Sequence, residues 1–200
     1  MRYRLGIKEI SATVFGSVAF IGISMFLLKH DCGKLSEYYF QIRLLLLTVM
    51  SALFGPIAGV LIGAGGSELS DMLIFGRASY ISVLAFGTYG LFIGKYAKYY
   101  GIRDGLFNRH SAAAFNVIQM LSSMIIWGFI VPLLTFLANK QDLLEAEMAG
   151  LETTMFNAAA VCLVCTPVFW LIDQGMRLNR KRIDRKKKSK KDDGILHVPG

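Results

Sequence analysis

Charged residues are scarce in this chain. Asp, Glu, Lys and Arg make up 18% of its 200 residues, whereas they form roughly a quarter of an ordinary soluble domain. Hydrophobic residues reach 54%, and the mean hydropathy is +0.48. Several apolar runs are long enough to cross a bilayer of about 30 Å, which takes roughly 20 residues per helix. This composition excludes an ordinary soluble domain and predicts an integral membrane protein.

Cysteine is also rare, with three residues in the chain. An odd, low count excludes a disulfide framework. Cys162 and Cys165 form a C-x-x-C pair inside an apolar run, but no second pair supplies the remaining ligands of a structural zinc site. His30, Asp31 and Cys32 are adjacent loop residues with poor ligand geometry. We therefore expect no metal site, and we interpret Cys162 and Cys165 as small buried apolar residues.

Familiar catalytic motifs are missing as well. The sequence has no H-E-x-x-H, G-x-S-x-G, Walker A or dinucleotide-binding glycine pattern. These absences argue against an enzyme and against any nucleotide site in this chain. No cofactor is implied, and an enzyme within the membrane is the least favoured class.

Apolar runs separated by turn residues predict an all-α membrane protein, a bundle of six transmembrane helices. The first run ends in "KHDCGKLSE" without a small-residue cleavage site, so we expect a retained helix rather than a signal peptide. Pro56 is tolerated only in the first turn of a helix and therefore separates the second helix from the third. The expected helices are Ile10–Leu28, Phe40–Phe54, Pro56–Phe75, Tyr80–Tyr96, Ala112–Leu137 and Thr154–Ile172. Residues 1–176 would form the substrate-binding transmembrane domain, and residues 177–200 a basic, disordered tail.

Lys and Arg placement predicts the orientation. The segment "RLNRKRIDRKKKSKKDD" carries ten Lys/Arg and three Asp, so it supplies +7 of the net charge of +8. This charge fits a tail beside anionic lipid headgroups and does not indicate a nucleic-acid partner. The loop 95–109 is basic and the connection 139–153 is acidic. By the positive-inside rule both termini are expected in the cytoplasm, in a multi-pass protein of the plasma membrane.

Small residues recur along two of the expected helices. Gly55, Gly59 and Gly63 stand four residues apart on the third helix. Ala12, Gly16 and Ala19 mark the first helix. Small residues let helix backbones approach closely in lipid, where no hydrophobic force drives association. Two interpretations stay open for them: packing within the bundle, and a surface for a partner helix.

Polar residues inside the apolar helices are the next feature. Glu68 and Asp71 lie three residues apart near one end of the third helix, and Arg43 is an available counter-charge. They form either a structural ion pair with Arg43 or the polar wall of an outward-facing pocket. Asn116 and Gln119 on the fifth helix predict hydrogen bonds between helices.

Aromatic and polar residues gather at the same ends of the expected helices. Trp127 is either a membrane-interface residue or a stacking wall, and Tyr80 and Tyr89 would flank the same cavity. We expect a cavity that opens to the outside and binds a small solute. Its candidate lining residues are Gln41, Arg43, Glu68, Asp71, Tyr80, Trp127 and Asn157.

Four stretches together resemble a known family: "ATVFGSVAF", "LFGPIAGVLIGAGGSELSD", "GTYGLFIG" and "FNVIQMLSSMIIWGFIVPLL". They look like the membrane-embedded substrate-binding subunits (S components) of energy-coupling factor (ECF) transporters, with the riboflavin-type branch the closest. Metal-type S components carry a histidine after the initiator methionine, and Arg2 stands there in this chain.

The resemblance implies six helices that capture a vitamin-like solute from outside, with a riboflavin-like molecule as the first guess and thiamine or another vitamin as alternatives. It also implies docking on a transmembrane coupling protein that is powered by two ATPases. Small residues of the first helix form the docking surface in that family, which corresponds here to Ala12 and Gly16, with Ala19 nearby. The alternative class is a structural or assembly membrane protein in which the glycines serve packing alone.

Overall fold

The computed structural model describes residues 7–29, 39–139 and 142–195. These residues are helical apart from short turns, and no strand occurs among them. The prediction of an all-α protein is therefore confirmed for the described part of the chain. In order, the elements are α1 (Ile7–Lys29), α3 (Tyr39–Phe54), α4 (Pro56–Val60), η1 (Leu61–Gly65), α5 (Gly66–Phe75), α6 (Tyr80–Lys95), α7 (Ala97–Tyr100), η2 (Ile102–Asp104), α8 (Arg109–Ile125), η3 (Ile126–Ile130), α9 (Val131–Asn139) and α10 (Leu143–Ile195).

Two of the long helices contain a π-helical turn. In one, α4, η1 and α5 follow one another without a break over the expected span Pro56–Phe75. In the other, α8, η3 and α9 run on from Arg109 to Asn139. Turns of this kind insert one residue into the helical ladder and often occur at functional sites. The sequence did not predict either of them.

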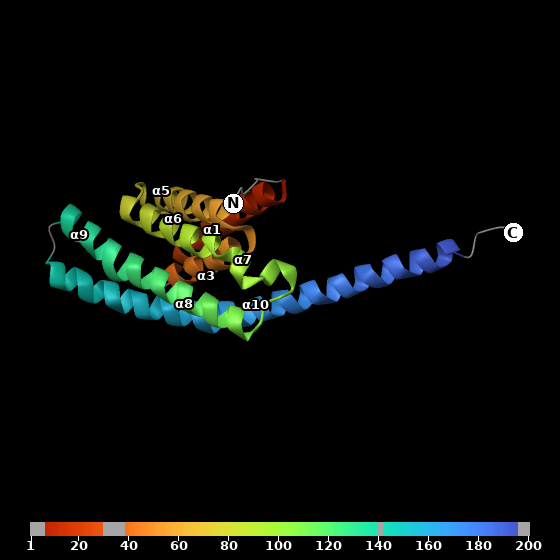
Figure 1. Cartoon of the computed structure of the whole chain (residues 1–200). Coiled ribbons are helices and arrows are strands. Elements are labelled where there is room, and N and C mark those ends of the chain that lie inside the picture. The colour runs from red at the N-terminus through yellow and green to blue at the C-terminus, as the bar shows by residue number, and fades with distance from the viewer. Residues whose placement is uncertain (1–6, 30–38, 140–141, 196–200) are drawn as a thin grey trace.

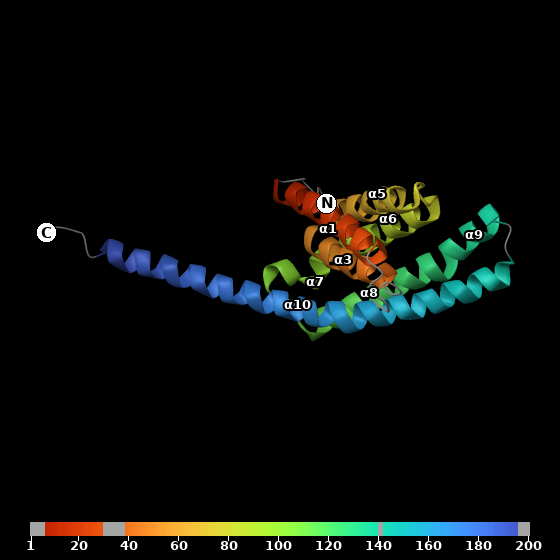
Figure 2. The ribbon, with the colours of Figure 1, turned by 180° about the vertical axis from the view of Figure 1, so that it is seen from behind.

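Length and composition qualify three described helices as membrane spans: Pro56–Phe75, Arg109–Ala138 and Leu143–Ile183. The shorter apolar stretches are Thr13–Leu27 and Phe40–Phe54. The α1 and α10 helices both pack against α3, which contains the second of these stretches, and Figures 1 and 2 show α8 and α9 beside the first half of α10.

The last helix differs from its predicted form. The sequence suggested a helix that ends near Ile172 and a disordered tail, but α10 continues as one helix to Ile195. Figure 1 shows it extending well beyond the other helices. Lys and Arg are good helix formers, and a helix that is already nucleated adds residues at low cost.

The two ends of the bundle are distinguished by the direction of the helices. The α3 helix runs from Phe40, beside Phe86 and Trp127, to Phe54, which lies next to Arg103. The end of the bundle that contains Phe40 and the α5–α6 connection is called the cavity end below. The end where α6 finishes and α10 leaves the bundle is called the tail end. Contacts of Gly16 with Met50 and of Phe20 with Arg43 show that α1 begins toward the tail end.

Glycine brings two helices into backbone contact. A Cβ atom added to Gly59 would overlap the backbone of Gly90, and one added to Gly63 would overlap the backbone of Phe86. A Cβ on Gly94 would lie 2.5 Å from the Cα of Pro56. We call this contact between α4–η1 and α6 the glycine seam. It supports the packing interpretation of Gly59 and Gly63, and Gly55 takes a left-handed φ of +92° at the turn that starts α4.

A polar clamp holds the tail end together. Asp173 of α10 is buried and accepts the backbone N–H of Phe107 at 2.9 Å. Arg177 lies 2.7 Å from the same carboxylate and donates to the Phe107 carbonyl at 3.1 Å. The loop between α7 and α8 is thereby fixed to α10 at the point where the basic extension begins.

Candidate functional site

Arg43 of α3 is the most deeply buried cation among the described residues, with 2% of its surface exposed. Its Nη2 atom donates to the Ser70 hydroxyl at 3.0 Å and to the Ser67 hydroxyl at 3.2 Å. Its Nη1 atom lies 3.5 Å from Asp71 Oδ1. All three partners belong to α5, so a buried charge pair links α3 to α5. The predicted ion pair therefore forms with Asp71, and Glu68 is exposed.

Aromatic rings surround the Arg43 guanidinium. Its central carbon lies 4.7 Å from the ring centroid of Phe20 and 4.9 Å from that of Phe86. A guanidinium between two ring faces gains cation–π attraction, which partly offsets the loss of water. The cation is therefore held in place by contacts on several sides, although it lies inside an apolar bundle.

A cavity of about 400 Å³ opens beside this pair at the cavity end. Phe40 and Phe86 form apolar walls, and the α5–α6 connection contributes the remaining rim. We call it the arginine cavity. Its lining residues are Phe40, Arg43, Asp71, Phe75, Arg77, Ala78, Ser79, Ser82 and Phe86.

Trp127 lies at the centre of an aromatic wall. Only 3% of it is exposed, and it lies within the π-helical turn η3. Its ring centroid is 5.0 Å from Tyr89, 5.8 Å from Phe40 and 6.0 Å from Phe86. Such burial favours the stacking-wall interpretation over a membrane-interface role.

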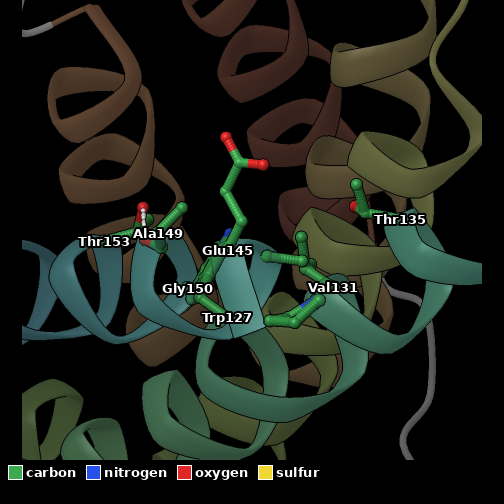
Figure 3. Close-up of a pocket in the computed structure, with 9 residues that line it drawn as sticks. Trp127, Val131, Thr135, Glu145, Ala149, Gly150 and Thr153 are labelled. Atoms are coloured by element: carbon green, nitrogen blue, oxygen red, sulfur yellow. Dashed lines mark hydrogen bonds between the residues drawn. The ribbon is translucent and has the colours of Figure 1, made fainter. Parts of the chain in front are cut away.

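A second cavity, of about 240 Å³, lies between α9 and α10 on the other side of Trp127. Figure 3 shows Trp127, Val131 and Gly150 around it, with the Glu145 side chain extending away from the α10 ribbon. We call it the α9–α10 cavity. Its lining residues are Trp127, Val131, Pro132, Thr135, Glu145, Ala146, Ala149, Gly150 and Thr153. Trp127 also contacts Phe40 and Phe86, which line the arginine cavity, so one aromatic wall borders both cavities.

Buried amides occur in the same half of the molecule. Asn157 is fully buried, and neither side-chain amide atom has a hydrogen-bond partner in the described part of the chain. The same holds for Gln41 Oε1 and Ser123 Oγ within residues 7–29, 39–139 and 142–195. A buried polar group without a partner costs about 1–3 kcal/mol, so such groups suit a polar ligand.

The predicted hydrogen bonds between helices are present. Gln119 Nε2 donates to the Ala158 carbonyl at 3.2 Å, and Thr166 Oγ1 donates to Asn116 Oδ1 at 3.0 Å. Both bonds join α8 to α10. Asn116 and Gln119 therefore connect helices, as the sequence indicated, and they line neither cavity.

The structure places the seven predicted lining residues in different surroundings, and only three of them line a cavity. Arg43 and Asp71 line the arginine cavity, and Trp127 lines the α9–α10 cavity. Gln41 and Asn157 lie in the bundle without lining either cavity. Tyr80 is 81% exposed and Glu68 is also exposed, because both side chains lie on outward faces of their helices.

Sequence reasoning missed part of the arginine cavity. Arg77 and Ser79 fall in the break between the expected helices Pro56–Phe75 and Tyr80–Tyr96, and Ser82 lies in the first turn of the second, so no helical pattern marked them. The available signal was the "GRAS" segment, in which a cation and a helix-capping serine follow a helix that carries Asp71. Ser79 caps α6 by accepting the Ser82 N–H at 3.4 Å.

The predicted docking residues lie on α1. Gly16 is buried, and a Cβ there would come within 2.6 Å of Ile62 Cδ1 and 2.9 Å of Met50 Cε. Gly16 therefore packs inside the bundle. Ala19 is half-buried, and the side chain of Ala12 lies outside the described residues. Gly22, which the sequence analysis did not select, is exposed with no atom within 4 Å of an added Cβ.

The cysteines and acidic residues form no metal site in the ranges that the structure describes, where no group of three or more His, Cys, Asp or Glu side chains comes together. Cys165 is buried with its sulfur 3.8 Å from the Leu45 carbonyl, and Cys162 is half-buried. Cys32 falls outside the described residues.

Comparison with known proteins supplies the context for this geometry. A UPF0397 protein of Lactococcus lactis subsp. cremoris (strain NZ9000) is 29% identical over 160 residues, which cover 80% of this chain and 87% of that protein. A UPF0397 protein of Streptococcus pneumoniae (strain Taiwan19F-14) is 26% identical over 166 residues, or 83% and 90% of the two chains. No solved structure matches the chain. The family model for the ECF-type riboflavin transporter S component matches residues 4–174, so the chain belongs to that family of transporter subunits.

Proposed function

We propose that this chain captures a vitamin-like solute from outside the cell for an ECF-type importer. The observation that carries the proposal is the aromatic wall of Trp127, Phe40 and Phe86 that borders two cavities at one end of the bundle. Small-molecule sites in proteins combine apolar walls with a few polar groups in this way. A riboflavin-like ring system is the first candidate, since the matching family model carries that name.

Six helices cross the plasma membrane in this proposal, with both termini in the cytoplasm. The α1 helix begins, and α10 leaves the bundle, at the tail end, where Lys95, Lys98 and Arg109 also lie. The positive-inside rule then directs the cavity end outward. Labelling of a Lys190→Cys, Cys32→Ser variant, but not of Cys32→Ser alone, by a membrane-impermeant thiol reagent from outside the cell would contradict this topology.

Energy for transport comes from other subunits. The sequence carries no nucleotide-binding motif, and S components work with a coupling protein and ATPases. Ala12 and Ala19 on α1 remain the proposed docking residues, beside the exposed Gly22. In this view Gly16 supports docking only indirectly, because it packs against Ile62.

The proposal is tested by the solute that the purified protein carries. We expect the wild-type protein to release a small ring-containing solute on denaturation, identified by absorbance, fluorescence and mass spectrometry. Trp127→Ala should lose most of it, because the variant removes the centre of the wall that borders both cavities. Trp170→Ala is the matched control, since Trp170 packs on Phe107 at the tail end. If the chain instead has a structural or assembly role, neither the wild-type protein nor either variant should release such a solute.

Docking is tested separately from binding. Ala12→Leu with Ala19→Leu should abolish uptake while the isolated subunit still binds its solute, because added bulk blocks a partner helix. Gly16→Leu should damage folding and binding together, since the leucine would overlap Ile62 and Met50. Uptake that survives the double substitution would remove Ala12 and Ala19 from the docking surface.

A further inference from the structure

The final part of α10 continues beyond the packed part of the described chain. Residues 174–183 are all exposed apart from their contacts in the polar clamp, and Figures 1 and 2 show the helix running on, away from the bundle, to its end at Ile195. We call residues 177–195 of α10 the basic arm. Between Arg177 and Asp193 it has ten Lys or Arg residues and three Asp. Most of the positive charge of the chain is therefore placed on one helix outside the bundle.

The base of the basic arm is fixed to the bundle. Arg177 Nε lies 2.7 Å from Asp173 Oδ2, and the same guanidinium donates at 3.1 Å to the backbone of the loop between α7 and α8. Arg180 lies 3.5 Å from Asp104 in that loop. The ion pair of Asp173 and Arg177 also spans Gly175, a residue type with low helix propensity, and an acid four residues before a base stabilises a helix. The arm therefore leaves the bundle as a continuation of α10, in a direction that the bundle sets.

The basic arm has no apolar face along its described turns. Its apolar residues before Ile195 are Leu178 and Ile183, and both are exposed. At 3.6 residues per turn, these two positions lie about 140° apart around the helix. A helix that lies in the membrane interface buries a continuous apolar face among the lipids. This arm lacks such a face, and a helix that is polar on all sides is suited to crossing solvent between two bodies.

The length of the arm distinguishes a lipid partner from a protein partner. An α-helix rises about 1.5 Å per residue, so Lys187 and Lys188 lie about 21–23 Å along the helix beyond Asp173, where α10 leaves the bundle. A tilt of about 40°, the upper end of the range for membrane helices, reduces this height to about 16–17 Å. The headgroup layer is about 5–8 Å thick, and its attraction falls off within a Debye length of about 8 Å. The headgroup role therefore fits Lys181 and Arg182 at the base of the arm, and it does not fit Lys187 and Lys188.

We propose that the basic arm binds an acidic surface of a protein subunit that is docked at the tail end of this chain. Complementary charge steers association and selects the partner. A fixed base keeps the charges of the arm at a constant position relative to the bundle, which favours a partner that is itself held on the bundle. S components work with a coupling protein and ATPases, and we assign the acidic surface to these subunits. The inference rests on the proposed function, because it names a contact within the same importer.

A second copy of this chain does not supply the acidic surface. The acidic stretch 142–152 lies at the opposite end of α10 from the arm. Two copies with the same orientation in one membrane therefore present their acidic stretches and their arms on opposite sides. The partner is thus a different chain, on the side of the membrane where α10 leaves the bundle.

Binding of the purified full-length chain to its purified coupling module, the coupling protein with its ATPases, tests the inference in detergent by surface plasmon resonance. The test variant is Lys187→Glu with Lys188→Glu. The matched control is Lys181→Glu with Arg182→Glu, which makes the same change in charge nearer the bundle. Glutamate and lysine have similar helix propensities, and circular dichroism checks that the helix is retained. We expect at least tenfold weaker binding by the test variant and less than a threefold change in the control. Equal affinity of wild type and test variant would overturn the inference.

A second variant keeps every charge and changes only the placement of the arm. Three glycines inserted between Ile183 and Asp184 interrupt the helix, because glycine has low helix propensity. We expect binding to the coupling module to weaken at least fivefold. Unchanged affinity would show that the charges act as a flexible tail, which would overturn a role for the fixed arm.

Vesicles that contain phosphatidylglycerol test the lipid alternative. Weaker binding of the test variant to these vesicles, together with unchanged binding to the coupling module, would assign the arm to headgroups and overturn the inference. Solute release should match wild type in every arm variant, because the arm is remote from both cavities. Solute capture by a chain whose binding to the module ignores the arm would overturn the inference alone. Arm-dependent binding to the module without any captured solute would overturn the capture function and leave the inference standing.

Discussion

The same two helical segments meet in opposite ways at their two ends. Along the glycine seam, α4–η1 and α6 touch through their backbones at Gly59 and Gly90. Toward the connection between α5 and α6, α5, which continues the first segment, and α6 line the arginine cavity through Phe75, Ser82 and Phe86. Small residues allow close backbone contact along the glycine seam. At the arginine cavity, a buried arginine and aromatic rings lie between the two segments instead. We infer that the close backbone contact along the glycine seam fixes how the two segments lie relative to one another. It thereby fixes the positions of the residues that line the arginine cavity.

The largest expected effect comes from breaking the charge pair at the arginine cavity. Arg43→Leu leaves Asp71 buried without its cation, which should reduce the free energy of unfolding by about 3–5 kcal/mol. Thermal unfolding in detergent, followed by circular dichroism, measures the loss. A double variant, Arg43→Leu with Asp71→Leu, should recover most of the stability, because replacing both charges removes the uncompensated group. Failure of the second substitution to restore stability would show that Arg43 acts chiefly through the rings of Phe20 and Phe86.

Disrupting the glycine seam should reduce the free energy of unfolding slightly less than breaking the charge pair does. Gly59→Leu forces a side chain into the Gly90 backbone, and overpacking of this kind costs about 1–3 kcal/mol or more. The control is Gly65→Leu, because a Cβ at Gly65 meets no atom within 4 Å. Unfolding temperatures of the two variants measure the effect. An equal shift for both would mean that glycine acts through helix propensity rather than through close contact.

The turn between α3 and α4 and the glycine seam could be predicted from the sequence, whereas the position of Gly16 could not. Gly55 and Pro56 placed the turn between α3 and α4 because a left-handed residue and a missing N–H leave few alternatives. Spacing of four residues predicted that Gly59 and Gly63 share a face, and the seam supports it. The sequence could not predict whether Gly16 faces the bundle or a partner helix, because small residues suit both kinds of contact equally.

The residues of the arginine cavity were harder to predict from the sequence, for a different reason. Glu68 and Asp71 are three residues apart, yet one is exposed and the other is buried against Arg43. A spacing of three places side chains about 60° apart on a helix, which is enough to divide them at the edge of a bundle. Arg77 contributes through a connection between helices, where no periodic pattern exists to reveal it. The π-helical turn that contains the buried Trp127 has no simple signal in the sequence.

Asn157 should separate stability from solute binding. Its amide is fully buried without a hydrogen-bond partner in the part of the chain that the structure describes. Asn157→Leu removes that cost, so the free energy of unfolding of the solute-free protein should rise by about 1 kcal/mol. Affinity for the captured solute should stay near the wild-type value, because Asn157 lines neither cavity. Isothermal titration and thermal unfolding of the same preparations give both numbers, and a variant that loses stability would assign Asn157 a structural role.

The smallest effect is expected on the exposed face of α1. Gly22→Leu meets no neighbouring atom in the bundle and should change the unfolding temperature by less than about 2 °C. Solute binding by the isolated subunit should stay at the wild-type level. A marked loss of binding would show that this face communicates with the cavities rather than lying apart from them.

The central claim is that a solute binds at the cavity end, against the aromatic wall. An experimental structure of the protein with its released solute added back tests this most directly. We predict density for the solute in the arginine cavity, with its ring against Phe40 and Phe86 and Trp127 behind them. Density at the tail end, near Asp173 and Phe107, or on the lipid-facing surface of α1, would contradict the account.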